Sequence, residues 1–195
     1  MAAPVACWEI SAAFVVSPHS ERGRIAIFRM TTLTFVHVAI SLVGILSGLV
    51  VSFGMLAAKK LEGWTALFLG TTVATSITGF FFPFKGFTPG DAIGIISLVV
   101  LAVAILARYR RNLAGGWRRT YAISAVIALY LNVFVLIVQL FEKVPVLNAL
   151  APTQKEPPFA ATQVVVMALF VVLGIAAAKR FREAGPVPVQ RARAA

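Results

Sequence analysis

Residues 120–141 read TYAISAVIALYLNVFVLIVQLF, a run of 22 residues without a charged side chain. Four further neutral runs occupy residues 31–58, 63–84, 92–107 and 157–178. An α-helix rises about 1.5 Å per residue, so about 20 apolar residues cross the hydrocarbon core of a bilayer. None of the runs alternates apolar and polar residues with the period of two that is typical of membrane β-barrels. The five runs therefore predict five transmembrane helices.

We expect an all-α integral membrane bundle of five transmembrane helices. The apolar runs and the turns between them place the spans at approximately residues 32–57, 64–83, 91–109, 119–141 and 159–179. The third run is short, but the Arg108 side chain can extend its charged end to the membrane surface. We assign residues 31–180 to the transmembrane domain, residues 1–30 to an N-terminal tail and residues 181–195 to a basic C-terminal tail.

The composition excludes an ordinary water-soluble domain. Of the 195 residues, 59% are apolar and 13% are charged, whereas a soluble domain has about 45–50% and about 25%. The 18 Lys and Arg residues outnumber the 7 Asp and Glu residues, which gives a net charge of +11. These cations flank the apolar runs and lack the interleaved aromatic residues of a nucleic-acid surface. We therefore expect no nucleic-acid binding.

The cations are divided unequally between the two sides of the membrane. Twelve follow the first, third and fifth spans, and six precede the first span or follow the second and fourth. Cytoplasmic loops carry the excess of Lys and Arg. We therefore expect a multi-pass membrane protein with its N-terminus outside and its C-terminus in the cytoplasm. The basic stretch 179–193 is expected to lie near anionic lipid headgroups at the cytoplasmic face, or only to fix the orientation.

The first 29 residues oppose this orientation, because they hold three of the six cations on the predicted outer side. Met30 directly precedes the first span. This supports the hypothesis that translation of the native protein begins at Met30. N-terminal sequencing that finds residues 1–29 would contradict it.

No residues form a recognisable catalytic or cofactor-binding constellation. The chain has one cysteine and no Cys/His cluster with metal-ligand spacing. It lacks a Walker glycine loop and the GxSxG and HExxH motifs. We therefore expect no catalytic residue, no cofactor, no metal site and no enzymatic activity.

The first span has one face of small residues. Ser41, Gly44, Gly48 and Ser52 recur at spacings of three or four residues, which places them on one side of a helix. Gly44 and Gly48 form a GxxxG motif, which lets a second helix approach closely. We expect this face to serve helix packing, and specific dimerisation is the alternative.

Five polar side chains inside the predicted spans are candidates for a functional site, because polar groups in hydrocarbon are costly. They are His37, Thr78, Asn132, Gln139 and Gln163. With the N-terminus outside, all of these except Asn132 come to similar depths, so a polar cluster in the outer leaflet is geometrically possible. The first, second and fourth spans are expected to form the inner core, with the third and fifth more peripheral.

His37 is the only ionisable residue deep in a neutral run, and three interpretations of it remain open. It is a hydrogen-bonded packing residue, a proton- or solute-responsive site that titrates near neutral pH, or a haem or metal ligand. A haem would need a His–Met pair such as His37 with Met167, because His19 lies in the tail.

Three stretches of the chain are similar to a known group of proteins. They are VHVAIS at 36–41, TGFFFPFKGFTP at 78–89 and LAPTQKEPPF at 150–159. Together they resemble uncharacterised small polytopic bacterial inner-membrane proteins, over roughly residues 30–180. The resemblance implies a polytopic bacterial membrane protein and supplies no activity, cofactor or catalytic residue.

Three functions are compatible with these observations. We expect a non-enzymatic accessory or interaction component of the membrane, with a membrane protein partner or a second copy of the chain. The first alternative is a small-solute or proton-coupled carrier that uses the polar residues around His37. The second alternative is a redox membrane protein that binds haem or quinone.

Overall fold

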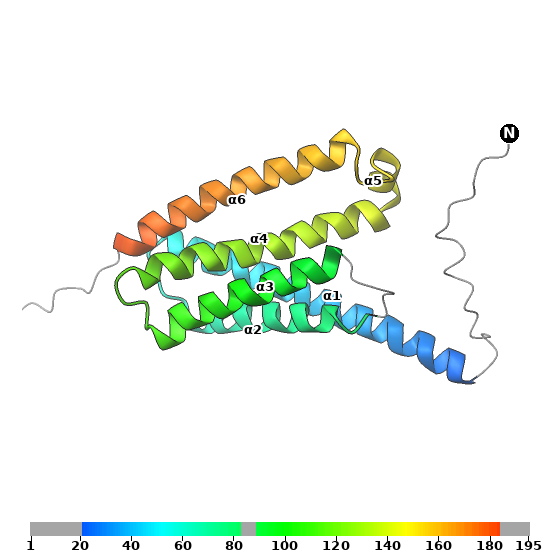
Figure 1. Ribbon diagram of the computed structural model, residues 1–195, viewed down its shortest axis with the longest axis horizontal. Coiled ribbons are helices and arrows are strands. Elements are labelled where there is room, and N and C mark those ends of the chain that lie inside the picture. The colour runs from blue at the N-terminus through cyan, green and yellow to red at the C-terminus, as the bar shows by residue number, and fades with distance from the viewer. Residues whose placement is uncertain (1–20, 83–88, 184–195) are drawn as a thin grey trace, which may run out of the picture. The chain divides into compact units, whose positions relative to one another are not determined.

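The computed structural model describes the backbone of residues 21–82 and 89–183 and the side chains of residues 32–82 and 89–181. The described residues are helical and contain no β-strand. The elements are α1 (Glu21–Leu56), α2 (Glu62–Gly79), α3 (Pro89–Ile105), the π-helical turn η2 (Leu106–Arg110), α4 (Trp117–Lys143), α5 (Pro145–Leu150) and α6 (Pro157–Glu183) (Figure 1). The prediction of an all-α chain is confirmed.

The chain divides into two units, residues 1–37 and residues 38–195. In the N-terminal unit, α1 begins at Glu21, about three turns before the predicted start of the first span. A neutral run marks only the part of a helix that crosses hydrocarbon, so charged turns that continue the helix into water escape the pattern. The backbone of the expected tail is therefore helical from Glu21, while residues 1–20 lie outside the described residues.

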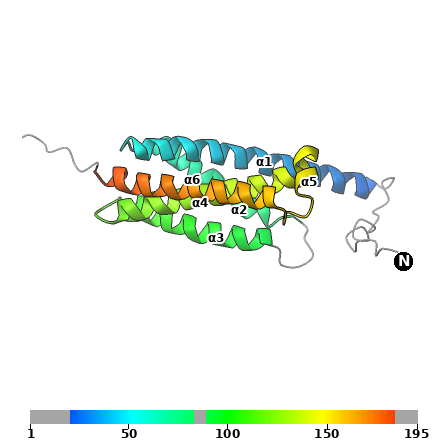
Figure 2. The same cartoon turned by 90° about the horizontal axis from the view of Figure 1, so that it is seen from above.

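In the second unit, consecutive long helices run in opposite directions (Figure 1). The central helix is α4, which packs against α3, α5 and α6, while α2 packs against α3 (Figure 2). The α4 residues Ala122, Ala125 and Ala128 are at most 1% exposed. Their small side chains let neighbouring helices approach α4 closely.

Four helices among the described residues are long and apolar enough to cross a membrane. They comprise Thr32–Leu56, Pro89–Arg110, Trp117–Lys143 and Pro157–Phe181, and they are the helices of a membrane protein. The predicted span 64–83 coincides with α2, which has 18 residues and ends at Gly79. The threonine and serine residues of α2 make it less apolar than the other four. Residue 83 lies outside the described residues.

The helices differ in how much of each span is buried inside the protein. The buried share is 44% for α1 and α4, 22% for α3 with η2, and 6% for α6. The third and fifth predicted spans are therefore the more peripheral of these four, as expected. Two elements were not predicted, namely η2 and the short helix α5, which begins at Pro145.

Candidate functional site

The candidate site is a polar seam where α1, α2 and α4 meet, formed by Ser41, Gly44, Thr72, Thr75 and Asn132. The Ser41 hydroxyl donates a hydrogen bond to Thr75 Oγ1 over 3.4 Å. The Asn132 side-chain amide donates from Nδ2 to Thr72 Oγ1, also over 3.4 Å. Thr72 is 1% exposed and Thr75 is 8% exposed. The seam therefore joins three helices through partly buried hydrogen bonds.

Helical spacing assembles the polar seam. Thr72 and Thr75 are three residues apart, so they share a face of α2. Gly44 has no side chain, which lets α1 approach that face. A Cβ atom at Gly44 would lie 3.2 Å from Thr71 Oγ1, 3.4 Å from Thr72 Oγ1 and 3.6 Å from Asn132 Nδ2. The space beside Gly44 is therefore already filled by polar atoms of α2 and α4.

Gly48 lies at an even closer contact between α1 and the other helices. A Cβ atom there would lie 2.7 Å from Leu129 Cδ1 and 2.8 Å from Phe68 Cδ2. Leu129 is fully buried and Phe68 is 1% exposed, so neither has free space to move into. Ser52, one turn further along, is 2% exposed. Gly44 and Gly48 of the GxxxG motif thus pack within the chain, against α2 and α4.

Several other hydroxyl groups in the bundle bond to their own helices. Each donates to the backbone carbonyl four residues earlier, over distances between 2.6 and 3.0 Å. These residues are Ser47, Thr71, Ser76, Thr78 and Ser124. A hydroxyl group bonded in this way is satisfied without a ligand. These five hydroxyl groups are therefore bonded within their own helices, which suits helix packing.

The other candidate residues of the second unit lie apart from the polar seam. Gln139 is exposed. Gln163 on α6 donates from Nε2 to the Phe134 carbonyl over 3.4 Å, and its Oε1 has no hydrogen-bond partner among the described residues. Asn132 and Phe134 are about 200° apart around α4. Asn132 and Gln163 therefore meet different sides of α4 and do not contact each other.

His37 is half-buried on α1 and is the last residue of the N-terminal unit. Thr78, Gln139 and Gln163 belong to the second unit. The outer-leaflet cluster of His37 with Thr78, Gln139 and Gln163 therefore stays a prediction. The same holds for a pair of His37 with Met167.

Known proteins offer no assignment for these clusters. No protein-family model, curated protein or solved structure matches the chain. Within the side chains described, no group of three or more His, Cys, Asp and Glu residues is placed to hold a metal ion. The function has to be inferred from the hydrogen-bonded and charged clusters themselves.

Three side-chain amides, which we call the amide clamp, hold α5 and the start of α6 against the end of α4. Asn148 Nδ2 donates to the Phe141 carbonyl over 3.2 Å, and Gln154 Nε2 donates to the Val138 carbonyl over 3.3 Å. Gln163, described above, is the third. Asn148 and Gln154 were not among the predicted candidate residues, although Gln154 lies within the stretch 150–159 that carries the resemblance.

The loop before α6 is ordered by one carboxylate. Glu156 Oε1 accepts hydrogen bonds from the Thr153 hydroxyl over 2.7 Å and from the Thr153 backbone N–H over 3.2 Å. Its Oε2 accepts the Lys155 backbone N–H over 3.0 Å. Since these donors favour the charged form, chiefly the Thr153 hydroxyl, the pKa of the Glu156 carboxyl lies below its ordinary value.

At the opposite end of α4, a buried arginine joins three elements. Arg108 is 8% exposed, and its guanidinium carbon lies 5.6 Å from the centre of the Tyr121 ring. Its Nη2 lies 4.0 Å from Glu62 Oε1, and the Tyr121 hydroxyl donates to Thr65 Oγ1 over 3.3 Å. The Arg108 side chain does not extend away from the protein, because its guanidinium group packs against the Tyr121 ring. The start of α2, the turn η2 and the start of α4 therefore lie together.

Proposed function

We propose that this chain is a non-enzymatic integral membrane protein that acts as an accessory or interaction component of the bacterial inner membrane. The observation that carries the proposal is the polar seam, because its polar side chains bond to one another across three helices. Asn132, which lies near the middle of α4, donates to Thr72 on α2. Polar residues used in this way stabilise helix association.

A carrier would need space beside these polar groups, because transporter sites lie in cavities between moving helices. A Cβ atom at Gly44 would already meet Asn132 Nδ2 at 3.6 Å and two threonine hydroxyls at closer range. This packing favours a fixed scaffold over a transport pathway that uses Asn132.

The scaffold presents a long apolar face on α6. Only 6% of its spanning window is buried inside the protein. The exposed side chains include Val164, Val165, Leu169, Val171 and Val172. Such a face is covered by lipid, by a membrane protein partner or by a second copy of the chain.

We propose five spans, with α2 as the fifth membrane-crossing helix. Glu62 at the start of α2 approaches Arg108 near the end of the spanning helix Pro89–Arg110. Pro89 therefore lies on the other side of the membrane from Glu62, and the chain between them has to cross. The 18 residues of α2 span about 27 Å. Its hydroxyl groups are compatible with this position because they bond within the bundle.

We propose that the end of the bundle that holds Arg108 is cytoplasmic, which places the N-terminus outside. Of the Lys and Arg residues whose side chains are described, nine lie at this end and two lie at the other. The nine are Lys59, Lys60, Arg108, Arg110, Arg111, Arg118, Arg119, Lys179 and Arg180, and the two are Lys143 and Lys155. The excess of Lys and Arg marks the cytoplasmic side.

Cysteine labelling tests the span number and the orientation together. Cys7 is the only cysteine, so Lys60→Cys and Lys155→Cys are made separately in a Cys7→Ser background. A membrane-impermeant maleimide added to spheroplasts is expected to label Lys155→Cys and not Lys60→Cys. The same reagent added to inverted vesicles is expected to label Lys60→Cys. Labelling of both positions from one side would contradict the crossing of α2, and the reversed pattern would contradict the orientation.

Photo-crosslinking and flux measurements test the accessory role. A photoreactive amino acid at Val171 on α6, which is 55% exposed, is expected to give one protein adduct of defined mass in native membranes. The same residue at Val99 on α3, which is also exposed, is the matched control. Purified protein in liposomes is expected to leave proton and solute fluxes at the level of empty liposomes. Lipid adducts alone, together with a flux that Asn132→Ala abolishes, would contradict the proposal in favour of a carrier.

A further inference from the structure

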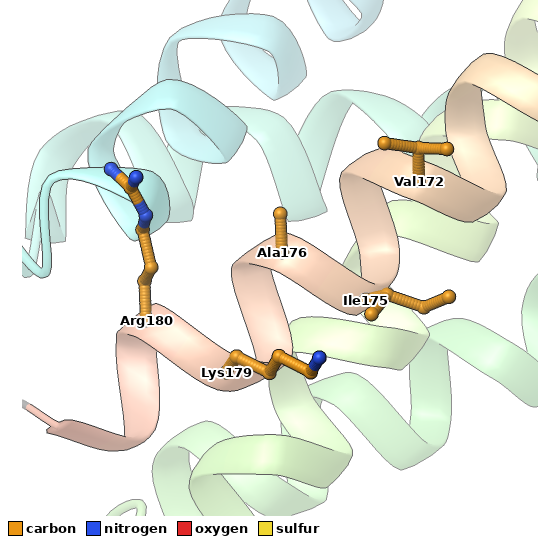
Figure 3. A pocket seen from close by; sticks show the side chains of 5 residues that line it. All are labelled: Val172, Ile175, Ala176, Lys179 and Arg180. Atoms are coloured by element: carbon orange, nitrogen blue, oxygen red, sulfur yellow. The ribbon is translucent and has the colours of Figure 1, made fainter.

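A groove on α6 combines an apolar part with a charged end. It is lined by Val172, Ile175, Ala176, Lys179 and Arg180, and we call it the α6 groove (Figure 3). These residues recur at spacings of three and four, so they share one face of the helix. The small Ala176 side chain lies among the lining residues, and the Lys179 and Arg180 side chains diverge at the end of the groove (Figure 3).

The position of the groove along α6 matches the depth profile of a bilayer leaflet. Val172 is 65% exposed and Ile175 is 53% exposed, so in a membrane both face the acyl chains. Lys179 and Arg180 are exposed at the end of the spanning window Pro157–Phe181. Long basic side chains at this place reach the level of the lipid headgroups.

The charges around the groove favour an anion. The only described acidic side chain at this end of the bundle is Glu62, which lies beside Arg108. Lys179 and Arg180 form no ion pair with any described side chain. An arginine offers paired donors to phosphate oxygens, and a lysine adds a compact positive charge.

We propose that the α6 groove binds one anionic phospholipid. Its phosphate lies at the charged end of the groove, where the long Lys179 and Arg180 side chains can turn toward it, and one acyl chain lies along Val172, Ile175 and Ala176. This site rests on the proposed membrane placement of α6 and is independent of the accessory role. Lipid binding is measured on the purified chain without a partner protein. A negative result would therefore count against the lipid site and would leave the accessory role untouched.

The test is native mass spectrometry of the full chain released from nanodiscs that hold equal amounts of phosphatidylglycerol and phosphatidylcholine with identical acyl chains. The wild-type chain is expected to retain one phosphatidylglycerol in preference to phosphatidylcholine. Each cation near the surface changes the affinity about fivefold. Lys179→Gln with Arg180→Gln is therefore expected to reduce the preference about 25-fold.

Two further variants separate a site from general attraction. Arg110→Gln with Arg119→Gln removes the same charge from exposed positions at the same end, and is expected to keep the preference because neither residue lines the α6 groove. Ala176→Leu places a larger side chain in the groove without changing a charge, and is expected to reduce retention of both lipids. Circular dichroism checks that each variant keeps its helices.

Three results would overturn the proposal. The first is equal retention of the two lipids by the wild-type chain. The second is an equal loss of preference in the groove variant and in the Arg110/Arg119 control, which would show attraction to the whole basic face. The third is unchanged retention in Ala176→Leu.

Discussion

Replacing Gly48 by alanine tests the packing of α1 against α2 and α4. The new Cβ atom would lie 2.7 Å from Leu129 Cδ1, whereas ordinary contact begins at 3.4 Å, so a shift of about 0.7 Å is required. Leu129 and Phe68 are buried on all sides. Overpacking a core in this way costs about 1–3 kcal/mol, while the change from glycine to alanine in a helix gains up to about 1 kcal/mol.

Gly70→Ala is the matched control. Gly70 is an exposed residue of α2, and a Cβ atom there would meet nothing within 4 Å. Both variants gain the same helix propensity. The difference between their free energies of unfolding therefore measures the steric cost at Gly48. We expect Gly48→Ala to lower the free energy of unfolding by about 1–3 kcal/mol relative to Gly70→Ala. Gly44→Ala, with its closest contact at 3.2 Å, is expected to fall between them.

The free energy is measured by reversible unfolding in mixed micelles, in which a denaturing detergent is titrated and the helix content is followed by circular dichroism. Equal free energies of unfolding for Gly48→Ala and Gly70→Ala would refute the inference that α1 packs too closely against Leu129 to admit a side chain at position 48. A stabilised Gly48→Ala variant would refute it more strongly, because it would show that the space beside Gly48 is free.

Three further predictions follow from the clusters. Asn132→Leu and Thr72→Val are expected to couple by about 0.6–1.7 kcal/mol in a double-mutant cycle of unfolding, and zero coupling would contradict the hydrogen bond between them. Arg108→Ala is expected to destabilise the chain by about 1–2 kcal/mol, so an unchanged melting temperature would show that its contact with Tyr121 contributes nothing. Thr153→Val is expected to raise the pKa of Glu156 toward its ordinary value of 4.5 in carboxyl NMR titrations. Because the folded pKa is lowered, the stabilisation that this carboxylate provides is complete above that value and is lost as the pH falls through the folded pKa. An unchanged Glu156 titration would show that the Thr153 hydroxyl is not the cause.

The apolar runs predict the long helices well because crossing hydrocarbon constrains length and composition at once. The neutral runs 120–141 and 157–178 lie in α4 and α6, whose bounds are close to the predicted ones. The neutral runs say little about the parts outside hydrocarbon. The start of α1 at Glu21 and the six-residue helix α5 both lie outside the neutral runs, so no apolar run marks them.

The candidate site was only partly predictable, because a sequence pattern identifies the face of a helix but not the residues that it contacts. The spacing of Ser41, Gly44 and Gly48 identifies a helix face, and the cost of an amide in hydrocarbon singles out Asn132. Neither argument selects a partner, because the partner depends on the rotation of α2 about its axis. Thr72 and Thr75 were visible in the sequence as hydroxyl groups among several, and only the packed bundle distinguishes them from Thr71 and Thr78.

The way α6 is held explains how an exposed helix can present a defined surface. Near its start, Gln163 of the amide clamp donates to α4. Near its end, Phe181 is 1% exposed and its ring centre lies 6.0 Å from that of Tyr121. Between these two attachments most of the apolar side chains point away from the protein. A helix fixed at both ends keeps its middle in one orientation. That middle is the segment on which both a partner protein and a lipid in the α6 groove would depend.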